Sequence, residues 1–498
     1  MLKEYRTLFP YLKKYRFNYI AGFVCLIVVD GAQLLIPQFI KKAIDTVSQG
    51  SFRMESIFFV SLSIIGAAVL ISSGRFLWRF FIIGASRRIE TELRDKLFDR
   101  LLNLPLSFFQ RNKTGDLMAR ATNDMSAIRQ ATAMGFVAFI DGVFMSGAIL
   151  IIMIVQNPSI ALLTVIPLPI ISLLIIIFGT MIGKRFTKVQ EIFSRLSDIA
   201  QETISGIRVI KAFVKEDYFE DTFSKANDEY RDSSMSLVKV AGLFFPLINF
   251  LAGLTIVILL FAGGGAVLEN RMSAGDIVAM LSYLQMLIWP MIGAGFTVNL
   301  IQRGAASLKR VNEILEEKSE MEAAAESCST CGPSSGAAAG SDKAGEKEEV
   351  SGRLLVKNLS YSFTEKPVLN DISFTLDQGQ TLGILGSVGS GKSTLIKLLV
   401  RLIEPTPGTI FIGEKDVRDI SLPTLRKTFG VVPQDSFLFS ETVEANIRFG
   451  SPELSNERFD TISTISTISR DVETFPASWE TIVGEKGLTL SGGQKQRI

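Results

Sequence analysis

The segment that decides the fold reads Gly386-Ser387-Val388-Gly389-Ser390-Gly391-Lys392-Ser393. It fits the pattern Gly-x-x-x-x-Gly-Lys-Ser/Thr, in which backbone N–H groups and a lysine surround the phosphates of a nucleotide. A β-rich stretch at 381–385 precedes it, and 393–402 has the apolar spacing of a helix. A strand, a loop and a helix in that order are the context that the motif requires. The sequence therefore predicts a nucleotide-binding domain of the α/β class.

The residue types in this loop each have a chemical role. Its glycines allow backbone N–H groups to face phosphate oxygens, and the start of the following helix adds positive potential. Lys392 reaches the β- and γ-phosphates, and the Ser393 hydroxyl binds Mg²⁺. The pattern alone does not show to which class of nucleotide-binding proteins the chain belongs. The predicted nucleotide contacts of the segment are Gly386, Ser387, Gly389, Ser390, Gly391, Lys392, Ser393 and Thr394.

A second glycine-rich segment, Leu490-Ser491-Gly492-Gly493-Gln494, lies near the end of the sequence. Ser491, Gly492 and Gly493 begin a predicted helix, so they offer a hydroxyl and uncovered backbone N–H groups to an anion. We predict that Ser491, Gly492, Gly493 and Gln494 also contact nucleotide.

The first three hundred residues contain six apolar stretches long enough to cross a bilayer, which takes about 20 residues each. Basic residues before the first stretch place the N-terminus in the cytoplasm, and we expect no cleaved signal peptide. The sequence thus predicts a multi-pass protein of the cell membrane. The stretches are Phe17–Ile36, Ser56–Ile83, Gly135–Val155, Ile160–Ile182, Val240–Leu268 and Ile277–Leu300, and the basic residues are Lys3, Arg6, Lys13, Lys14 and Arg16.

Charged sequence with helical spacing separates the second stretch from the third, and the fourth from the fifth. Residues 87–97 have the alternation of an amphipathic helix, and 184–231 continue in the same style. Both charged segments are expected on the cytoplasmic side of the membrane, where they can contact a soluble domain.

Two acidic residues, Asp30 and Asp141, lie inside predicted spans. A charge at the centre of a bilayer costs about 2.5–3.5 kcal/mol on insertion scales, so such residues usually face a cavity or a partner. Both are candidates for contacting a cationic substrate. Asp141 lies close to the end of its span, and reaching the interface is the alternative explanation for it.

The composition changes between 316 and 352, where Ala, Ser, Gly, Glu and Lys dominate. Such a stretch buries too little apolar surface to offset its ordering entropy, so we predict a flexible linker. Cys328 and Cys331 form a Cys-x-x-Cys within it, but no histidine or second cysteine pair completes a zinc site.

These segments together resemble the exporters of the ATP-binding cassette (ABC) family. In Tyr361-Ser362-Phe363, Phe363 occupies the place of the aromatic residue that stacks on adenine; Tyr361 is the alternative, and core packing is an equal explanation for both rings. Gln434, in Val431-Val432-Pro433-Gln434-Asp435, matches the glutamine that reaches Mg²⁺ and the attacking water. By this resemblance Lys392 and Gln434 are catalytic, and Ser393 and Gln434 hold the metal.

Four further segments carry the resemblance. Residues 114–124 and 202–213 are similar to the family's two coupling regions, so short coupling helices are expected near Thr114–Ala121 and Val214–Phe219. Glu441–Ile447 and Thr481–Gly487 also match segments of these exporters.

The resemblance implies an α-helical membrane domain at 1–315, with six transmembrane helices and long cytoplasmic extensions, and an α/β nucleotide-binding domain at 353–498. It implies ATP-driven export of hydrophobic or amphipathic drugs, lipids or peptides. Because two cassettes of the family face each other head to tail, the expected partner is a second half-transporter in a homo- or heterodimer. The formal net charge of +2 gives no reason to expect nucleic acid.

The sequence departs from the family after Gln494, where only Lys495–Ile498 follow, and it contains no histidine. Family members continue with an acidic strand that assists Mg²⁺ and water, and then a histidine at the γ-phosphate. Such positioned charges supply most of the rate in phosphoryl transfer. We therefore expect the nucleotide-binding domain to be incomplete and ATP hydrolysis by the chain as written to be negligible. The alternative hypotheses are a catalytically silent nucleotide-binding or regulatory partner subunit, and a non-functional fragment.

A three-residue repeat occupies 461–469, where the family has a helical subdomain. Its β-branched residues lower helix propensity. Apolar residues nevertheless form one helical stripe, so we predict a helix. The stripe consists of Phe459, Ile462, Ile465, Ile468 and Val472.

Overall fold

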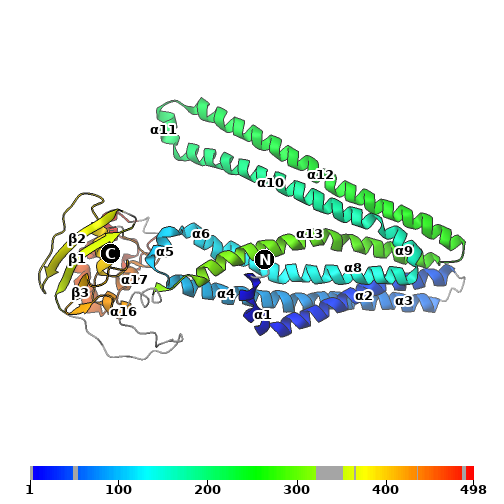
Figure 1. The fold of residues 1–498 in the computed structure, drawn as a ribbon, viewed down its shortest axis with the longest axis horizontal. Coiled ribbons are helices and arrows are strands. Elements are labelled where there is room, and N and C mark those ends of the chain that lie inside the picture. The colour runs from blue at the N-terminus through cyan, green and yellow to red at the C-terminus, as the bar shows by residue number, and fades with distance from the viewer. Residues whose placement is uncertain (1–3, 49–53, 321–351, 364–365, 435, 485–489) are drawn as a thin grey trace. The chain divides into compact units, whose positions relative to one another are not determined.

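The computed structural model describes residues 4–48, 54–320, 352–363, 366–434, 436–484 and 490–498. The chain divides into two compact units, Met1–Ser319 and Glu320–Ile498. The first is helical, and the second combines a small sheet with short helices (Figure 1). The predicted fold class, a helical membrane domain followed by an α/β domain, is confirmed. The predicted linker, with Cys328 and Cys331, lies almost wholly outside the described residues.

Six helical segments among the described residues of the first unit are long and apolar enough to cross a membrane, which confirms the six predicted spans. Several continue well beyond their apolar part. Helix α12 has 53 residues and is therefore about 80 Å long, whereas the hydrocarbon core of a bilayer measures about 30 Å. The elements are η1 (Glu4–Leu8), α1 (Phe9–Lys14), α2 (Arg16–Ser48), α3 (Met54–Trp78), η2 (Arg79–Ile83), α4 (Gly84–Leu102), α5 (Leu106–Arg111), α6 (Thr114–Ala119), η3 (Arg120–Asp124), α7 (Met125–Gln130), η4 (Ala131–Gly135), α8 (Phe136–Gln156), α9 (Pro158–Val165), α10 (Pro167–Ser205), α11 (Ile207–Ala212), α12 (Glu216–Leu268) and α13 (Ala274–Glu316).

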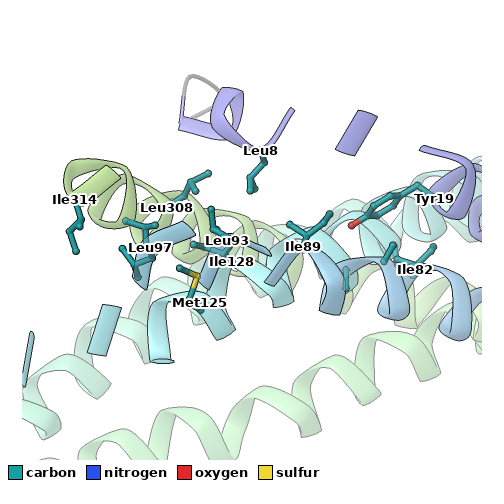
Figure 2. Packing of buried hydrophobic residues seen from close by; sticks show 14 of the residues in the cluster. Leu8, Tyr19, Ile82, Ile89, Leu93, Leu97, Met125, Ile128, Leu308 and Ile314 are labelled. Atoms are coloured by element: carbon teal, nitrogen blue, oxygen red, sulfur yellow. The ribbon is translucent and has the colours of Figure 1, made fainter. Parts of the chain in front are cut away.

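Two large apolar clusters hold the described part of this unit together, and a smaller one joins α2 to α3. The first joins α4, α7 and the C-terminal half of α13 through residues such as Leu93, Ile128 and Leu308 (Figure 2). The second joins α8, α10 and α12 to the N-terminal half of α13, and includes Ile171 and Tyr283. Helix α13 therefore contributes to both clusters.

Helices α10 and α12 pair side by side as a long hairpin that α11 closes, and Figure 1 shows this hairpin diverging from the other helices toward α11. In the diverging part, Val189, Ile192 and Leu196 of α10 and Ala226 of α12 are buried. Large apolar side chains also stay exposed along the hairpin, including Phe186, Phe193, Phe223 and Met235.

The two expected coupling helices have different outcomes. A short helix, α6, lies at the first expected position, and its coupling role stays a prediction. The second was expected near Val214–Phe219, and this position is wrong, because the short helix is α11 at Ile207–Ala212. Val214 has a φ of 50°, in the left-handed region that ends a helix. Helix α12 then starts at Glu216, whose carboxylate favours a helix N-terminus.

The second unit contains a four-stranded antiparallel sheet with the order β2-β1-β3-β4. Leu395 and Leu398 of α15 lie in the same buried cluster as Val356 and Ile410 of the sheet. The strands predicted at 354–356 and 372–376 are confirmed within β1 and β2. The elements are β1 (Leu354–Ser362), β2 (Pro367–Leu376), α15 (Lys392–Leu399), β3 (Ile410–Ile412), β4 (Lys415–Asp416), α16 (Leu422–Lys427), α17 (Val443–Arg448), α18 (Asn456–Ile465), α19 (Ile468–Val472), η5 (Ser478–Glu480) and α20 (Gly492–Arg497).

The strand predicted at Thr381–Leu385 is wrong, since this stretch belongs to no sheet in the described part of the chain. A strand exists only where its N–H and C=O groups pair with a neighbouring strand, and no described strand pairs with these residues. Leu385 is consequently 97% exposed despite its apolar side chain.

The predicted apolar stripe is only partly correct. The segment forms two helices, α18 and α19, because Thr467 has a φ of 61° and interrupts the helix between them. This break rotates the second half, so Ile468 and Val472 are buried with Phe459, whereas Ile462 and Ile465 are exposed.

An ion pair between a buried carboxylate and an exposed arginine joins η3 to α13 in the first unit. Asp124 is 6% exposed, and its carboxylate accepts hydrogen bonds from Arg310 Nε and Ser307 Oγ, each at 2.8 Å. Hydrogen bonds between charged groups contribute about 1.5–3 kcal/mol. The pair therefore fixes how the π-helical turn of η3 meets the last part of α13.

We expect Asp124→Ala to destabilise the purified chain by about 2 kcal/mol, because the substitution leaves Arg310 and Ser307 without this acceptor. The matched control is Asp228→Ala, which removes an exposed i,i+3 pair with Arg231 and should cost less than about 0.5 kcal/mol. Thermal unfolding in detergent measures both. Equal melting temperatures for the two variants would contradict the assignment.

Candidate nucleotide-binding site

The side chain of Lys392 lies across the glycine-rich loop. Its Nζ donates hydrogen bonds to the backbone oxygens of Gly386 at 2.8 Å and Ser387 at 2.7 Å, and lies 3.4 Å from Ser390 Oγ. These three partners come from the same loop, so the ammonium group is already held over the position that the loop encloses. A phosphate oxygen arriving there would meet a positive charge that needs no reorientation.

Two glycines give the loop its shape. Gly389 and Gly391 have φ values of 83° and 88°, in the left-handed region where a Cβ is strained. A Cβ on Gly391 would in addition lie 2.8 Å from Leu369 Cδ2 and 3.0 Å from the Val368 oxygen. The loop therefore rests directly on β2, and only glycine permits this approach.

Helix α15 begins at Lys392, immediately after the loop. The N–H groups at its start have no partner within the helix, so they add partial positive charge where phosphate would lie. Ser393 is exposed and Thr394 is partly buried. Mg²⁺ keeps several waters and takes its other ligands from phosphates and a few protein oxygens, and the exposed Ser393 hydroxyl beside Lys392 fits such a metal.

A cavity of about 380 Å³ lies next to the loop. Its lining combines apolar side chains of β2 and α15 with the stretch 382–386 that leads into the loop. The lining residues include Leu369, Ile372, Phe374 and Leu395 together with Gly386, Ser390 and Lys392. Most of these side chains are apolar. The cavity therefore lies beside the position of the phosphates and does not form a second polar binding site.

The two aromatic candidates for adenine differ in exposure. Phe363 is 54% exposed, whereas Tyr361 packs against the core of the unit. Burial raises the pKa of the Tyr361 phenol. The rings meet edge to face, with centroids 5.1 Å apart. Phe363 therefore has a free face for stacking, and Tyr361 supports it from the core.

Gln434 is exposed. Among the described residues it makes no hydrogen bond or ion pair with the loop of Lys392, and Asp435 beside it lies outside those residues. The structure therefore brings Gly386, Ser387, Ser390 and Lys392 together but does not add Gln434 to them.

The segment 491–494 belongs to a different part of the unit. Ser491 Oγ accepts a hydrogen bond from the Gln494 N–H at 3.3 Å, and the Ser491 N–H donates to Gln494 Oε1 at 3.0 Å. This reciprocal cap starts α20. Arg497 of α20 forms a 2.7 Å ion pair with Asp471 of α19. In the described residues this segment makes no hydrogen bond or ion pair with the loop of Lys392.

Asp471 is a residue that the sequence analysis missed. It accepts hydrogen bonds from Arg497 at 2.8 Å and from Gln494 at 3.5 Å, and so holds the helix that presents Ser491. More than twenty residues separate these partners in the sequence, and no local pattern links them.

Family models match both parts of the chain. The model described as ABC transporter transmembrane region matches residues 19–291, and the model described as ABC transporter matches residues 369–498.

Curated bacterial relatives match almost the whole chain. One, from Bacillus subtilis, is named probable multidrug resistance ABC transporter ATP-binding/permease protein YheI; it is 34% identical, over 98% of this chain and 81% of the relative. The multidrug resistance-like ATP-binding protein MdlA of Escherichia coli is 30% identical, over 97% and 79%. An ATP-dependent lipid A-core flippase of Syntrophus aciditrophicus is 27% identical, over 97% and 77%.

Gly391→Ala should weaken binding of an ATP analogue about tenfold, because an alanine there is strained by about 1–2 kcal/mol and also collides with β2. Gly450→Ala is the control, since a Cβ at Gly450 meets nothing within 4 Å. Fluorescence titration of the purified variants measures the affinities. A Gly391→Ala variant that binds as tightly as the control would show that the loop does not need this backbone conformation.

Proposed function

Because the chain belongs to the ABC transporter family, as a half-transporter of the exporter type, we propose that it exports hydrophobic or amphipathic compounds across the cell membrane and is driven by ATP bound at Gly386–Ser393. The observation that carries this proposal is the combination of six membrane-length helices and a lysine-spanned phosphate loop in one chain. The helices alone would not point to ATP, and the loop alone would not distinguish a transporter from a soluble nucleotide-binding enzyme.

The proposed roles of the loop residues follow from their positions. Lys392 binds the β- and γ-phosphates, and the N–H groups of Gly389, Ser390 and Gly391 bind phosphate oxygens. Ser393 ligates Mg²⁺, with Gln434 as the second protein ligand and Phe363 stacked on adenine. When bound, Mg²⁺ neutralises charge on the phosphates.

We propose that a second half-transporter completes the nucleotide site, in a homo- or heterodimer. Ser491–Gln494 makes no hydrogen bond or ion pair with the loop of Lys392 in the described part of this chain, which supports a role at a partner's nucleotide. The diverging hairpin of α10 and α12 supports the same proposal, because its exposed apolar side chains form the kind of surface that a partner covers.

The substrate class that we propose is hydrophobic or amphipathic. The names of relatives refer to multidrug resistance and to lipid A-core, and compounds of both kinds partition into membranes. The basic residues Lys13 and Lys14 precede the first span, which supports a cytoplasmic N-terminus. Since six spans return the chain to the same side, the nucleotide unit is then cytoplasmic too.

Inverted membrane vesicles from cells that express the gene test this function. With ATP outside, we expect them to accumulate a neutral lipophilic dye, and we expect Lys392→Ala to abolish accumulation because the phosphate-binding charge is lost. Lys397→Ala, in the last turn of the same helix, is the matched control.

Accumulation that persists in Lys392→Ala vesicles would contradict ATP-driven export through this chain. Nucleotide binding without accumulation, restored by a co-expressed half-transporter, would instead identify a subunit that works only with a different partner.

A further inference from the structure

The N-terminal segment Arg6–Phe17 is fastened to the membrane unit along one face. Leu8 is fully buried in the same apolar cluster as side chains of α4 (Figure 2). Glu92 of α4 accepts hydrogen bonds from Lys14 Nζ and Tyr15 Oη, each at 2.5 Å. The position of the segment on this unit is therefore fixed, and so is the direction in which its other face points.

The other face carries three cations without partners. Arg6, Lys13 and Arg16 are exposed, and none of them forms a salt bridge or a side-chain hydrogen bond with another described residue. Glu4 is the only acidic residue from 4 to 17 in the sequence. The segment therefore keeps an excess of positive charge even though Lys14 is paired.

Two phenylalanine side chains lie among these cations. Phe9 is 66% exposed and Phe17 is 71% exposed. The Arg16 guanidinium lies over the Phe17 ring, 5.1 Å from its centroid. Leaving two large apolar rings in water is unfavourable. Basic residues beside exposed aromatic rings are typical of helices that lie in the interface of a membrane, with the rings below the headgroups.

The exposed apolar side chains of α2 indicate where the bilayer begins. From Phe17 they continue at Ile20 and Val24, a spacing of three or four residues that places them on one face of the helix. Helix α2 is one of the six candidate spans, so in a bilayer this face meets lipid tails. Lys13 and Arg16 come just before the first of these residues, at the depth of the lipid headgroups.

We propose that the exposed face of Arg6–Phe17 is a docking surface for an anionic phospholipid in the leaflet on the side of the N-terminus. Lys13 and Arg16 attract the negative charge of the headgroup, and Phe9 and Phe17 contact the start of the tails. An anionic lipid is favoured because the cations are otherwise unbalanced, and each basic residue near a negative membrane surface adds to the attraction. The inference goes beyond the proposed export function, since it concerns the lipid around the protein and not its substrate.

Competition between two lipids with equal tails separates charge recognition from hydrophobic binding. The purified full chain in detergent is mixed with equal amounts of dioleoyl phosphatidylglycerol, which is anionic, and dioleoyl phosphatidylcholine, which has no net charge. Native mass spectrometry then measures how much of each lipid is bound to the chain. We expect phosphatidylglycerol to be preferred about tenfold, which corresponds to about 1.4 kcal/mol.

The variant that combines Lys13→Gln with Arg16→Gln should reduce this preference to about twofold, because two charges at the headgroup depth are lost. The matched control combines Arg208→Gln with Lys215→Gln, which removes two exposed cations at the end of the hairpin where α11 lies. The control should keep the preference of the unaltered chain. Neither pair of residues forms a salt bridge with a described residue, so both variants should melt at the same temperature as the unaltered chain.

An excess of water-soluble glycerol phosphate should not displace the bound lipid, because it offers the headgroup charge without the tails. Displacement would show a site for a free phosphate compound and would overturn docking on a membrane surface. Equal binding of the two lipids to the unaltered chain would also overturn the inference, and so would a full preference in the variant of Lys13 and Arg16. This assay contains no ATP and measures no transport, so its result and that of the vesicle experiment are independent.

Discussion

The second unit depends on the contact between Gly391 and β2. The loop can reach Val368 and Leu369 only because Gly391 has no side chain and a left-handed backbone. This contact determines where α15 starts, at Lys392. It also places the lysine ammonium over Gly386 and Ser387. The capacity to bind an anion is thus a property of backbone geometry, to which one side chain adds charge.

A different constraint shapes the first unit. Within a bilayer every backbone polar group must find its partner inside the same helix, so the spans are continuous helices. Several helices extend beyond their apolar parts, and polar contacts cost less free energy there because water can reach them. The pair of Asp124 and Arg310 belongs to such an extension.

Local patterns predicted the parts of the fold that local forces determine. The six spans, the loop and α15 follow from hydrophobic runs and from a motif with fixed spacing, whereas α6 was expected from the resemblance to a coupling region. The strand at Thr381–Leu385 could not be predicted correctly, because a strand needs a neighbour. Ile462 and Ile465 are exposed on α18, and the left-handed backbone of Thr467 separates this helix from α19 with its buried Ile468 and Val472.

The site was predictable to a similar degree. The motif identified the residues around Lys392, since their chemistry is contained in one short segment. It did not reveal Asp471, whose contacts with Gln494 and Arg497 are created by tertiary packing. For the same reason the proximity of Asp30 on α2 to Asp141 on α8 became apparent only in the structure.

The affinities of the full chain for ATP and for AMP decide whether the loop recognises a triphosphate. With Lys392 present, ATP should bind at least about tenfold more tightly than AMP, since a charge-assisted hydrogen bond to the outer phosphates contributes about 1.5–3 kcal/mol. In Lys392→Ala this ratio should fall toward one. Equal affinities for the two nucleotides in the unaltered chain, or a ratio that the substitution does not change, would contradict a phosphate-binding role for this loop.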